Sequence, residues 1–187
     1  MDSRYLIVTD LETTGLNEDK HEIIQIAREV VDLQTRSRMP DGNMDCYVIP
    51  TNWDKREYEA MKVNGLERWF LQSNGENLWE ALRRYSVGVP WDNASMASWG
   101  DLENKFLPRA FISTNRPIPF NHRTTDIRSY AWLKQVEVYR DTDYAGLTEV
   151  AERLGITVNT QLLHDAVYDV WLTSEVLIRL LGGNDGS

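Results

Sequence analysis

The first 50 residues carry the apolar pattern of β-strands. Residues 4–12 (RYLIVTDLE) are apolar or β-branched on both faces, which predicts a central strand covered on both sides. The segments HEIIQIAREVVDL (21–33) and MDCYVIP (44–50) predict two further strands. Between them, the polar segment RSRMPDGN (36–43) contains a proline and a glycine and predicts the turn. Together these elements predict an antiparallel three-strand meander.

From residue 51 to residue 86 the apolar spacing becomes helical. Three segments have this spacing, NWDKREYEAMKV (52–63), LERWFLQSN (66–74) and NLWEALRRY (77–85), and Asn-Gly pairs separate them. Beyond them, SMASW (95–99) predicts a short strand. We interpret the region as a helical excursion inserted between strands of one sheet.

The second half of the chain mixes clear and ambiguous elements. The segment ENKFLPRAF (103–111) predicts the start of a helix that its proline cuts, and TTDIRSYAWLKQV (124–136) fits a strand or a helix. The segment LTEVAERLG (147–155) predicts a helix ended by its glycine. HDAVYDVWLTSEVLIRLLGG (164–183) predicts a long amphipathic helix that ends at Gly182. Strands, then helices, then mixed elements predict an α/β fold.

Length and composition predict one soluble domain. A chain of 187 residues favours a single core, which we assign to residues 1–182, with a flexible tail at 183–187. A hydrophobic content of 42% is ordinary for a globular protein. The N-terminal apolar run is too short for a signal peptide or a membrane span, and the single Cys46 fits a reducing compartment. We therefore expect a cytoplasmic protein without structural zinc or membrane contact.

The charge balance excludes binding of nucleic acid by long-range attraction alone. The chain has 20 basic and 29 acidic residues, a net charge of −9. A site for divalent cations must itself be rich in carboxylates, however, and such a site can hold a short strand end through metals, stacking and a few local cations. A nucleic-acid enzyme that uses metal ions therefore remains open.

Two carboxylates stand at the end of the first predicted strand. Asp10 and Glu12 are two residues apart, so both side chains leave the same face of the strand. Like charges this close are costly unless a cation neutralises them, so the pair is a metal site or an exposed strand end. Thr13, Thr14 and Gly15 follow directly, and their hydroxyls and free amides could hold a terminal nucleotide.

A second constellation opens the last predicted helix. Five residues separate His164 from Asp169, about 140° around a helix, so the two can meet only if His164 stands at or just before the helix start. Asp169 then lies beside the buried stripe of the helix, where a carboxylate needs a cation. Taken singly, His164 is also compatible with an idle helix-start residue and Asp169 with a partly exposed charge.

The two constellations resemble a known family. The opening DLETTGL followed by HEIIQIAREVVD, and the closing H-x-A-x-x-D in LLHDAVYD, resemble the DEDDh branch of the DnaQ-like 3′→5′ exonucleases. The resemblance implies an RNase H-like α/β fold, in which a mixed sheet combines the antiparallel meander with parallel strands and is flanked by helices. It also implies that Asp10, Glu12 and Asp169 bind two divalent ions, Mg²⁺ or Mn²⁺, and that His164 is the general base.

The middle motif of the family departs from its pattern here. Where the family places an aspartate, MASWGDLENKFL aligns Glu103, and Asp101 lies two residues earlier. We favour Glu103 for this role and keep Asp101 as the alternative. Asp126 corresponds better to a family aspartate that opens the next element and binds no metal.

Other residues suggest how a strand might be held. Leu16 and Leu66 match places where the family wedges apolar side chains against terminal bases, although both are compatible with an ordinary core. The segment 109–128 is the most basic stretch of the chain, which fits a path for the phosphate backbone or a solvated loop.

The sequence therefore predicts a two-metal 3′→5′ exonuclease that releases nucleoside monophosphates from the 3′ ends of single-stranded DNA or RNA. Two alternatives remain. The chain could be a catalytically silent module that binds nucleic acid or protein, or a phosphodiesterase for short oligonucleotides. The choice between DNA and RNA depends on a 2′-hydroxyl contact that the sequence does not reveal, and neither the oligomeric state nor the pathway follows from it.

Overall fold

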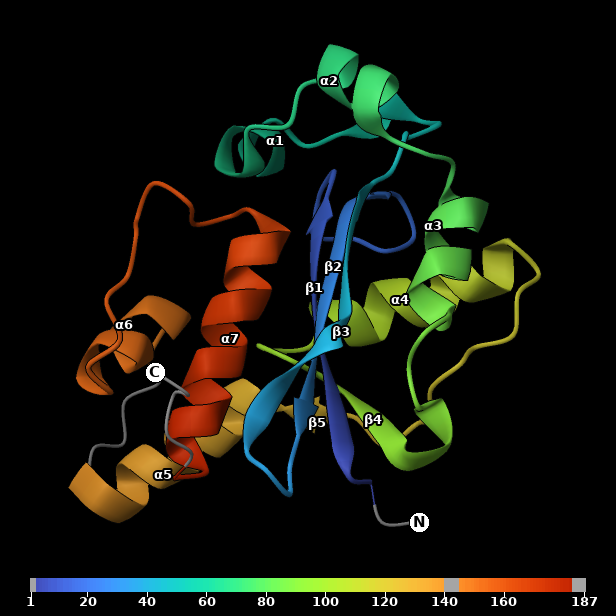
Figure 1. Cartoon of the computed structure of the whole chain (residues 1–187). Helices are drawn as coiled ribbons and strands as arrows, with labels where there is room; N and C mark the ends of the chain where they lie inside the picture. Colours follow the sequence, from blue (N-terminus) through green and yellow to red (C-terminus); the bar gives the residue numbers. More distant parts are fainter. Residues whose placement is uncertain (1–2, 140–144, 183–187) are drawn as a thin grey trace.

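A five-stranded mixed sheet forms the centre of the protein, as the computed structural model of residues 3–139 and 145–182 describes it (Figure 1). The tail predicted at 183–187 lies outside the described residues. The strand order is β3-β2-β1-β4-β5, with β1 (Tyr5–Thr13), β2 (Ile23–Asp32), β3 (Ser37–Tyr47), β4 (Ala94–Ser98) and β5 (Thr125–Asp126). The β3-β2-β1 meander is antiparallel, while β4 pairs parallel with β1 and β5 parallel with β4. The predicted RNase H-like mixed sheet is confirmed.

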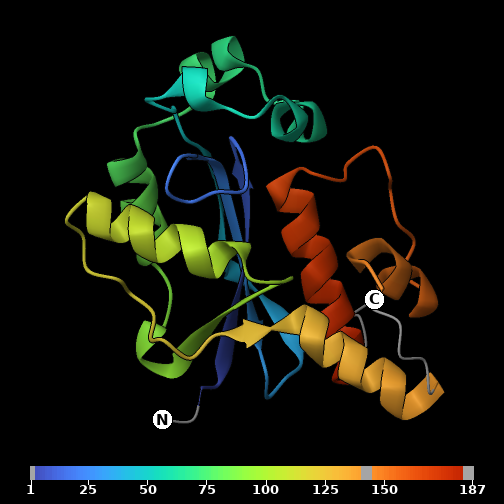
Figure 2. The ribbon, with the colours of Figure 1, turned by 180° about the vertical axis from the view of Figure 1, so that it is seen from behind.

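Helices cover both faces of this sheet. The helices of the described residues are α1 (Tyr58–Asn64), α2 (Arg68–Asn74), α3 (Leu78–Ser86), α4 (Leu102–Ser113), α5 (Ile127–Tyr139), α6 (Leu147–Arg153) and α7 (Ala166–Leu180), with short 3₁₀ turns at Trp53–Lys55 and Trp91–Asn93. Figures 1 and 2 show α5, α6 and α7 on one side, α3 and α4 on the other, and α1 and α2 beyond the upper end of the strands. None of the described helices is long and apolar enough to cross a membrane.

The two apolar faces of β1 explain this layering. Leu6 and Val8 pack on one face against Leu177 of α7, while Leu11 packs on the other face with residues of α3 and α4, including Phe106. Because β1 lies in the middle of the sheet and is covered twice, it carries apolar residues at successive positions. The carboxylates that end β1 continue the face of Leu6 and Val8, which is the face of α7.

The turn between the second and third strands was predicted at the wrong position. Residues 36–43 are not a turn: β3 begins at Ser37, and the hairpin turns at residues 33–36, where Arg36 has a φ of 54°. Pro40 is tolerated because β3 is an edge strand, where a missing amide need not break a ladder. A register shift opposite this segment brings Val30 against Gly42, whose lack of a side chain leaves room for it.

The proline at position 108 does not cut its helix, which is a second correction. Helix α4 continues from Leu102 to Ser113 through Pro108. A proline inside a helix costs about 3 kcal/mol because it lacks an amide and crowds the preceding turn. Here the helix also buries Phe106, Leu107, Ala110 and Phe111 in the core, and burial of such side chains gains roughly 1.5–3 kcal/mol each for the larger ones.

The segment that fitted both a strand and a helix contains both. Residues 125–126 form β5 and α5 starts at Ile127. The other predicted elements are confirmed with shifts of a few residues; α7, for example, starts two residues after His164.

Candidate active site

Three chain segments supply the candidate site, and Figure 1 shows the start of α7 beside the upper part of β1 and the start of α4 behind the middle of that strand. The end of β1 supplies Asp10 and Glu12, the first turn of α4 supplies Glu103, and the start of α7 supplies His164 and Asp169. One oxygen of Glu12, one oxygen of Asp169 and one ring nitrogen of His164 all lie within 4.8 Å of one another. The structure thus brings together residues that are more than 150 positions apart in the sequence.

The start of α7 gives His164 a fixed backbone position. His164 has a left-handed φ of 66° and stands directly before the N-cap residue, Asp165. Its amide donates to Asp169 Oδ2 at 2.9 Å, while Asp165 Oδ1 accepts from the amide of Val167 at 2.9 Å. The prediction that His164 stands just before the helix is confirmed, and this placement explains how it reaches Asp169 across five residues.

The two candidates for the middle carboxylate occupy different environments. Glu103 is 3% exposed, and its neighbours include Ser98 and the backbone of Leu11. The side chain of Asp101 is 75% exposed and forms an ion pair with Lys105 at 2.7 Å, on the outside of α4. Glu103 acts electrostatically on both Asp10 and Glu12. The geometry therefore favours Glu103 over Asp101 as the member of the cluster.

Burial and mutual repulsion raise the pKa values of the clustered carboxyl groups. Desolvation is the main cause for all four groups. It raises the pKa of Glu12 to about 8, with Asp169, Asp165 and Glu103 adding to the effect, and the pKa of Glu103 to about 7. The pKa of Asp10 rises well above its ordinary range, and the pKa of Asp169 also rises. Such a cluster favours bound protons or bound cations.

The donor set of the cluster fits divalent cations. Glu103 Oε2 and Asp169 Oδ1 are buried and accept no hydrogen bond from the residues that the structure describes. Buried acceptors without a donor are costly, and a cation between them would satisfy them. Carboxylate oxygens are the ligands that Mg²⁺ and Mn²⁺ prefer. The site is therefore able to hold hard divalent cations.

The Thr-Thr-Gly loop is shaped by its own hydrogen bonds. Thr13 Oγ1 donates to the carbonyl of Gly15 at 2.8 Å, and Thr14 Oγ1 accepts from the amide of Glu22 at 2.9 Å. Both hydroxyls thus shape the loop, while the Thr14 hydroxyl keeps its proton as a donor and the Thr13 oxygen can still accept, so their contact with a nucleotide stays a prediction. In contrast, the amides of Gly15 and Leu16 donate no hydrogen bond within the described part of the chain. These two amides are free donors directly after the two threonines.

His21 packs over Gly15 and was not singled out from the sequence. A Cβ on Gly15 would lie 2.5–2.7 Å from three ring atoms of His21, so only glycine fits there. His21 Nδ1 accepts from the amide of Asn17 at 3.0 Å, and its Nε2 lies 3.5 Å from Glu57 Oε1. Glu57 also donates its amide to the carbonyl of Thr14 at 2.7 Å. These contacts connect the loop to the start of α1.

The two predicted wedge residues have different surroundings. Leu16 is 71% exposed, so it is no core residue, whereas Leu66 is half-buried. Leu66 donates its amide to Asn64 Oδ1 at 3.0 Å, and Asn64 Nδ2 donates to the carbonyl of Thr13 at 3.3 Å. Asn64, at the end of α1, therefore joins the helical excursion to the tip of β1.

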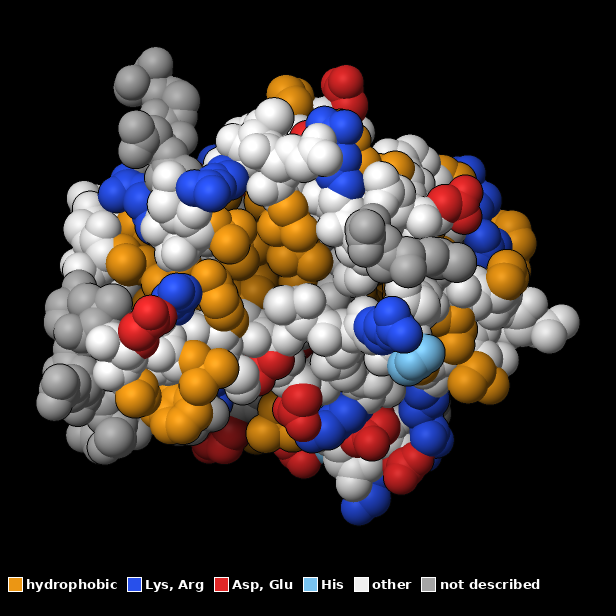
Figure 3. All heavy atoms as spheres, turned by 90° about the horizontal axis from the view of Figure 1, so that it is seen from below, with side chains coloured by type: hydrophobic (Ala, Val, Ile, Leu, Met, Phe, Trp, Pro, Cys, Tyr) orange, Lys and Arg blue, Asp and Glu red, His pale blue; other side chains and the backbone are white. Residues whose placement is uncertain are grey.

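Two other sequence features lie apart from the cluster. Asp126 caps α5, because its carboxylate accepts from the amide of Arg128 at 3.0 Å and from Ser129 Oγ at 2.5 Å. In the basic stretch, Arg109 forms an ion pair with Asp19, and the Arg116 guanidinium lies 4.4 Å from the centre of the Trp79 ring. Figure 3 shows Lys and Arg side chains interspersed with acidic ones on the face seen from below.

Comparisons with known proteins agree with this arrangement. Residues 7–177 match the family model RNase_T, described as exonuclease. DNA polymerase III subunit epsilon of Rickettsia typhi is 25% identical over 190 residues, which cover 100% of this chain and 78% of that protein.

Solved structures share the fold. Cell-death related nuclease 4 has a TM-score of 0.79 at 13% identity, over 96% of this chain and 64% of its own. E. coli exonuclease I in complex with a dA16 oligonucleotide has a TM-score of 0.76 at 17% identity, over 96% of this chain and 42% of its own. A 3′-exonuclease studied for 3′-end specific recognition of a histone mRNA stem-loop has a TM-score of 0.75 at 18% identity, covering 100% of this chain and 84% of its own.

Proposed function

Because the chain belongs to the RNase_T exonuclease family, we propose that it hydrolyses the terminal phosphodiester bond at the 3′ end of single-stranded DNA or RNA and releases nucleoside monophosphates. The observation that carries this proposal is the convergence of Glu12, His164 and Asp169 within 4.8 Å, beside the buried Glu103. Acidic oxygens and one imidazole are the groups that phosphodiester hydrolysis by metal ions requires.

The carboxylates are assigned to two divalent cations, Mg²⁺ or Mn²⁺. Asp10, Glu12 and Asp169 would hold them, with Glu103 at the buried side of the cluster. Two such cations, when bound, stabilise the charge on the entering and leaving oxygens of the phosphodiester. The raised pKa values support this assignment, as do Glu103 Oε2 and Asp169 Oδ1, which have no hydrogen-bond donor among the described residues, since a bound cation would offset the cost of burying these carboxylates.

His164 is assigned the role of general base. Its side chain is exposed, which gives it access to the attacking water, and a ring nitrogen lies close to the carboxylates of Glu12 and Asp169. The left-handed backbone of His164 and the hydrogen bond from its amide to Asp169 fix where the imidazole begins. The neutral imidazole would accept the proton of the water at that ring nitrogen.

The loop after β1 is assigned to the strand end. Gly15 and Leu16 follow Glu12 by three and four residues, their amides donate to no described residue, and the side chain of Leu16 is exposed. Amides can hydrogen-bond a terminal nucleotide and an apolar side chain can pack on its base. Leu66 and the hydroxyls of Thr13 and Thr14 would complete this subsite, since each hydroxyl shapes the loop and keeps capacity for one more hydrogen bond.

The experiment is digestion of 5′-labelled single-stranded DNA and RNA with Mn²⁺, Mg²⁺ or EDTA. We expect a ladder of shortened strands with either metal, none with EDTA, and a loss of about 10³-fold or more in Asp10→Ala. The faster of the two strands identifies the preferred sugar. Cleavage that stops at dimers would instead establish a phosphodiesterase for short oligonucleotides, and binding without cleavage would establish a silent module.

A further inference from the structure

A buried glutamine connects the sheet to the start of α7. Gln25 is 1% exposed and lies opposite Glu12 in the β1-β2 ladder. Its Nε2 donates to Asp165 Oδ1 and to Asp45 Oδ1, both at 3.2 Å, and its Oε1 accepts from the amide of Ala166 at 3.3 Å. All polar atoms of this side chain therefore have partners, and two of the three partners belong to the first turn of α7.

Those two partners lie between the two site residues that α7 supplies. Asp165 and Ala166 follow His164 directly, and the amide of Asp169 donates to the carbonyl of Asp165 at 3.0 Å. A shift of Asp165 or Ala166 would therefore move both His164 and Asp169. Gln25 in turn sits on the strand that pairs with Glu12. One side chain thus links both halves of the candidate site.

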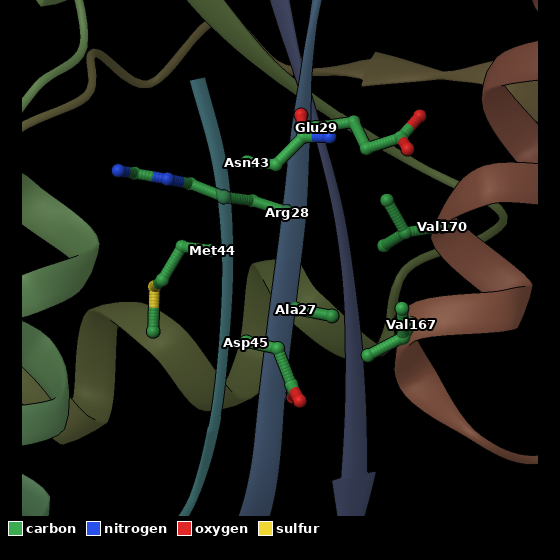
Figure 4. A pocket seen from close by; sticks show the side chains of 8 residues that line it. All are labelled: Ala27, Arg28, Glu29, Asn43, Met44, Asp45, Val167 and Val170. Atoms are coloured by element: carbon green, nitrogen blue, oxygen red, sulfur yellow. The ribbon is translucent and has the colours of Figure 1, made fainter. Parts of the chain in front are cut away.

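The start of α7 also packs on β2 through a small apolar contact. Ala166 and Val170 are buried and form a small core with Ala27. Beside them, a pocket of about 200 Å³ opens between the sheet and the helix, and its lining includes Ala27, Asp45 and Val167 (Figure 4). Figure 4 shows the side chain of Asp45 below Ala27, with Val167 and Val170 reaching from the helix toward the strands. Because apolar packing is not directional, the hydrogen bonds of Gln25 add the direction that this contact lacks.

The charges around Gln25 require an amide at this position. Asp45 and Asp165 are both carboxylates. Burial raises the pKa of Asp45 and Asp165 adds to this rise, whereas the hydrogen bond from Gln25 lowers the pKa of Asp45. A glutamate of the same size would keep the acceptor for Ala166 but replace the shared donor by a third carboxylate.

We propose that Gln25 is a positioning residue that sets the place of His164 and Asp169 relative to Glu12 by fixing the first turn of α7 to the sheet. This inference rests on the proposed function for its effect on catalysis. It concerns a side chain that touches neither the strand end nor a cation.

The test is a hydrogen-bond swap. Gln25→Glu removes the donor, and Gln25→Glu with Asp165→Asn returns a donor from the other side, since an asparagine at 165 can still accept from Val167 through its oxygen. Glu29→Gln is the matched control, because Glu29 is a buried residue of the same strand that contacts Arg38 at 3.1 Å and lies close to Ser174 of α7. Asp165→Asn alone completes the cycle.

Three readouts are needed: kcat and KM on a single strand, Mn²⁺ affinity by calorimetry, and hydrogen exchange of the His164 and Asp169 amides. For Gln25→Glu we expect kcat and Mn²⁺ affinity to fall about 10–100-fold, the range for residues that orient metal ligands, with KM nearly unchanged. Amide exchange at 164 and 169 should become faster. The double variant should regain at least about tenfold of the loss, and Glu29→Gln should stay within about twofold of wild type.

Equal behaviour of Gln25→Glu and Glu29→Gln would overturn the inference, as would a double variant that is no better than Gln25→Glu. Wild-type protein that neither cleaves nor binds Mn²⁺ would overturn the proposed function instead. The exchange rates would still decide whether Gln25 fixes the helix start, because they need no activity.

Discussion

At the scale of single residues, the candidate site is defined by which carboxylates point into the buried cluster. Glu103 and Asp101 are two positions apart in the sequence, yet Glu103 is buried in the cluster and Asp101 pairs with Lys105 outside it. Position 101 is the N-cap of α4 and position 103 lies in its first turn, so their side chains leave the helix in different directions. The longer side chain of a glutamate reaches the cluster from there.

This difference gives a prediction for a matched pair of variants. Glu103→Gln should lower kcat by about 10²-fold or more, because it removes a negative charge from the cluster that holds the cations. Asp101→Asn removes only a surface ion pair, worth about 0–1 kcal/mol, and should leave kcat within about twofold. Steady-state kinetics with Mn²⁺ measure both. The reverse order would move the middle role to Asp101.

At the scale of elements, the sheet edge and the helix starts differ most from their sequence patterns. Residues 36–43 have the composition of a turn, yet residues 37–43 belong to the 11-residue edge strand β3, because pairing with β2 overrides local preference. Likewise Pro108 lies inside α4, because the helix is held by its buried side chains. The local pattern of apolar residues identifies helices and strands well where they bury a continuous apolar face. It identifies them poorly where pairing with a distant strand determines the structure.

Glycine substitutions test the placement of β3. In Gly42→Ala the new methyl group would overlap Val30, so we expect a loss of about 1–3 kcal/mol in the free energy of unfolding. Gly146→Ala is the control, since a Cβ there meets no atom of the described residues within 4 Å, and its effect should stay within about 1 kcal/mol. Chemical denaturation measures both. An unchanged free energy of unfolding in Gly42→Ala would contradict the pairing of this segment with β2 and favour a turn.

The site itself could be predicted from the sequence only in part. Asp10 and Glu12 follow from strand alternation, and the spacing of His164 and Asp169 requires the histidine to precede the helix, as it does. Gln25 and His21 could not be found in this way, because their partners are distant in the sequence or are backbone atoms. A polar residue within an apolar strand, as in IIQIA, was the available signal for Gln25.

At the scale of the whole molecule, the fold gathers several carboxyl groups of an acidic chain into one buried cluster. The net charge is −9, and four carboxyl groups with raised pKa values meet at one end of the sheet. Without cations, the folded state must keep some of these groups protonated or pay for their repulsion. The site is therefore expected to couple stability to pH and to divalent cations.

Protonation of the cluster stabilises the folded state of the metal-free protein. The pKa of Glu12 is raised from 4.5 to about 8 in the folded state, and that of Glu103 to about 7. The folded state thus binds protons more tightly than the unfolded state, so this contribution is complete below pH 4.5 and is lost as the pH rises through 7 and 8. Metal-free protein should therefore have a lower Tm at pH 8 than at pH 6.

Mn²⁺ should reverse this loss, because it binds the ionised cluster of the folded state. We expect a larger rise in Tm on adding Mn²⁺ at pH 8 than at pH 6, by about 2–4 °C for each kcal/mol of linkage. Calorimetric scans with EDTA and with Mn²⁺ at both pH values measure it. Glu12→Gln should reduce the dependence on both pH and metal. A Tm that responds equally to Mn²⁺ at the two pH values would contradict the assignment of the cluster.

The most direct test of the central claim is the identity of the first product from a strand that carries a label only at its last phosphodiester. With Mn²⁺, the label should leave first as a nucleoside monophosphate from the 3′ end, and Asp10→Ala should release none. Release of the label within a longer fragment, or from the 5′ end, would contradict 3′→5′ exonuclease activity at this site.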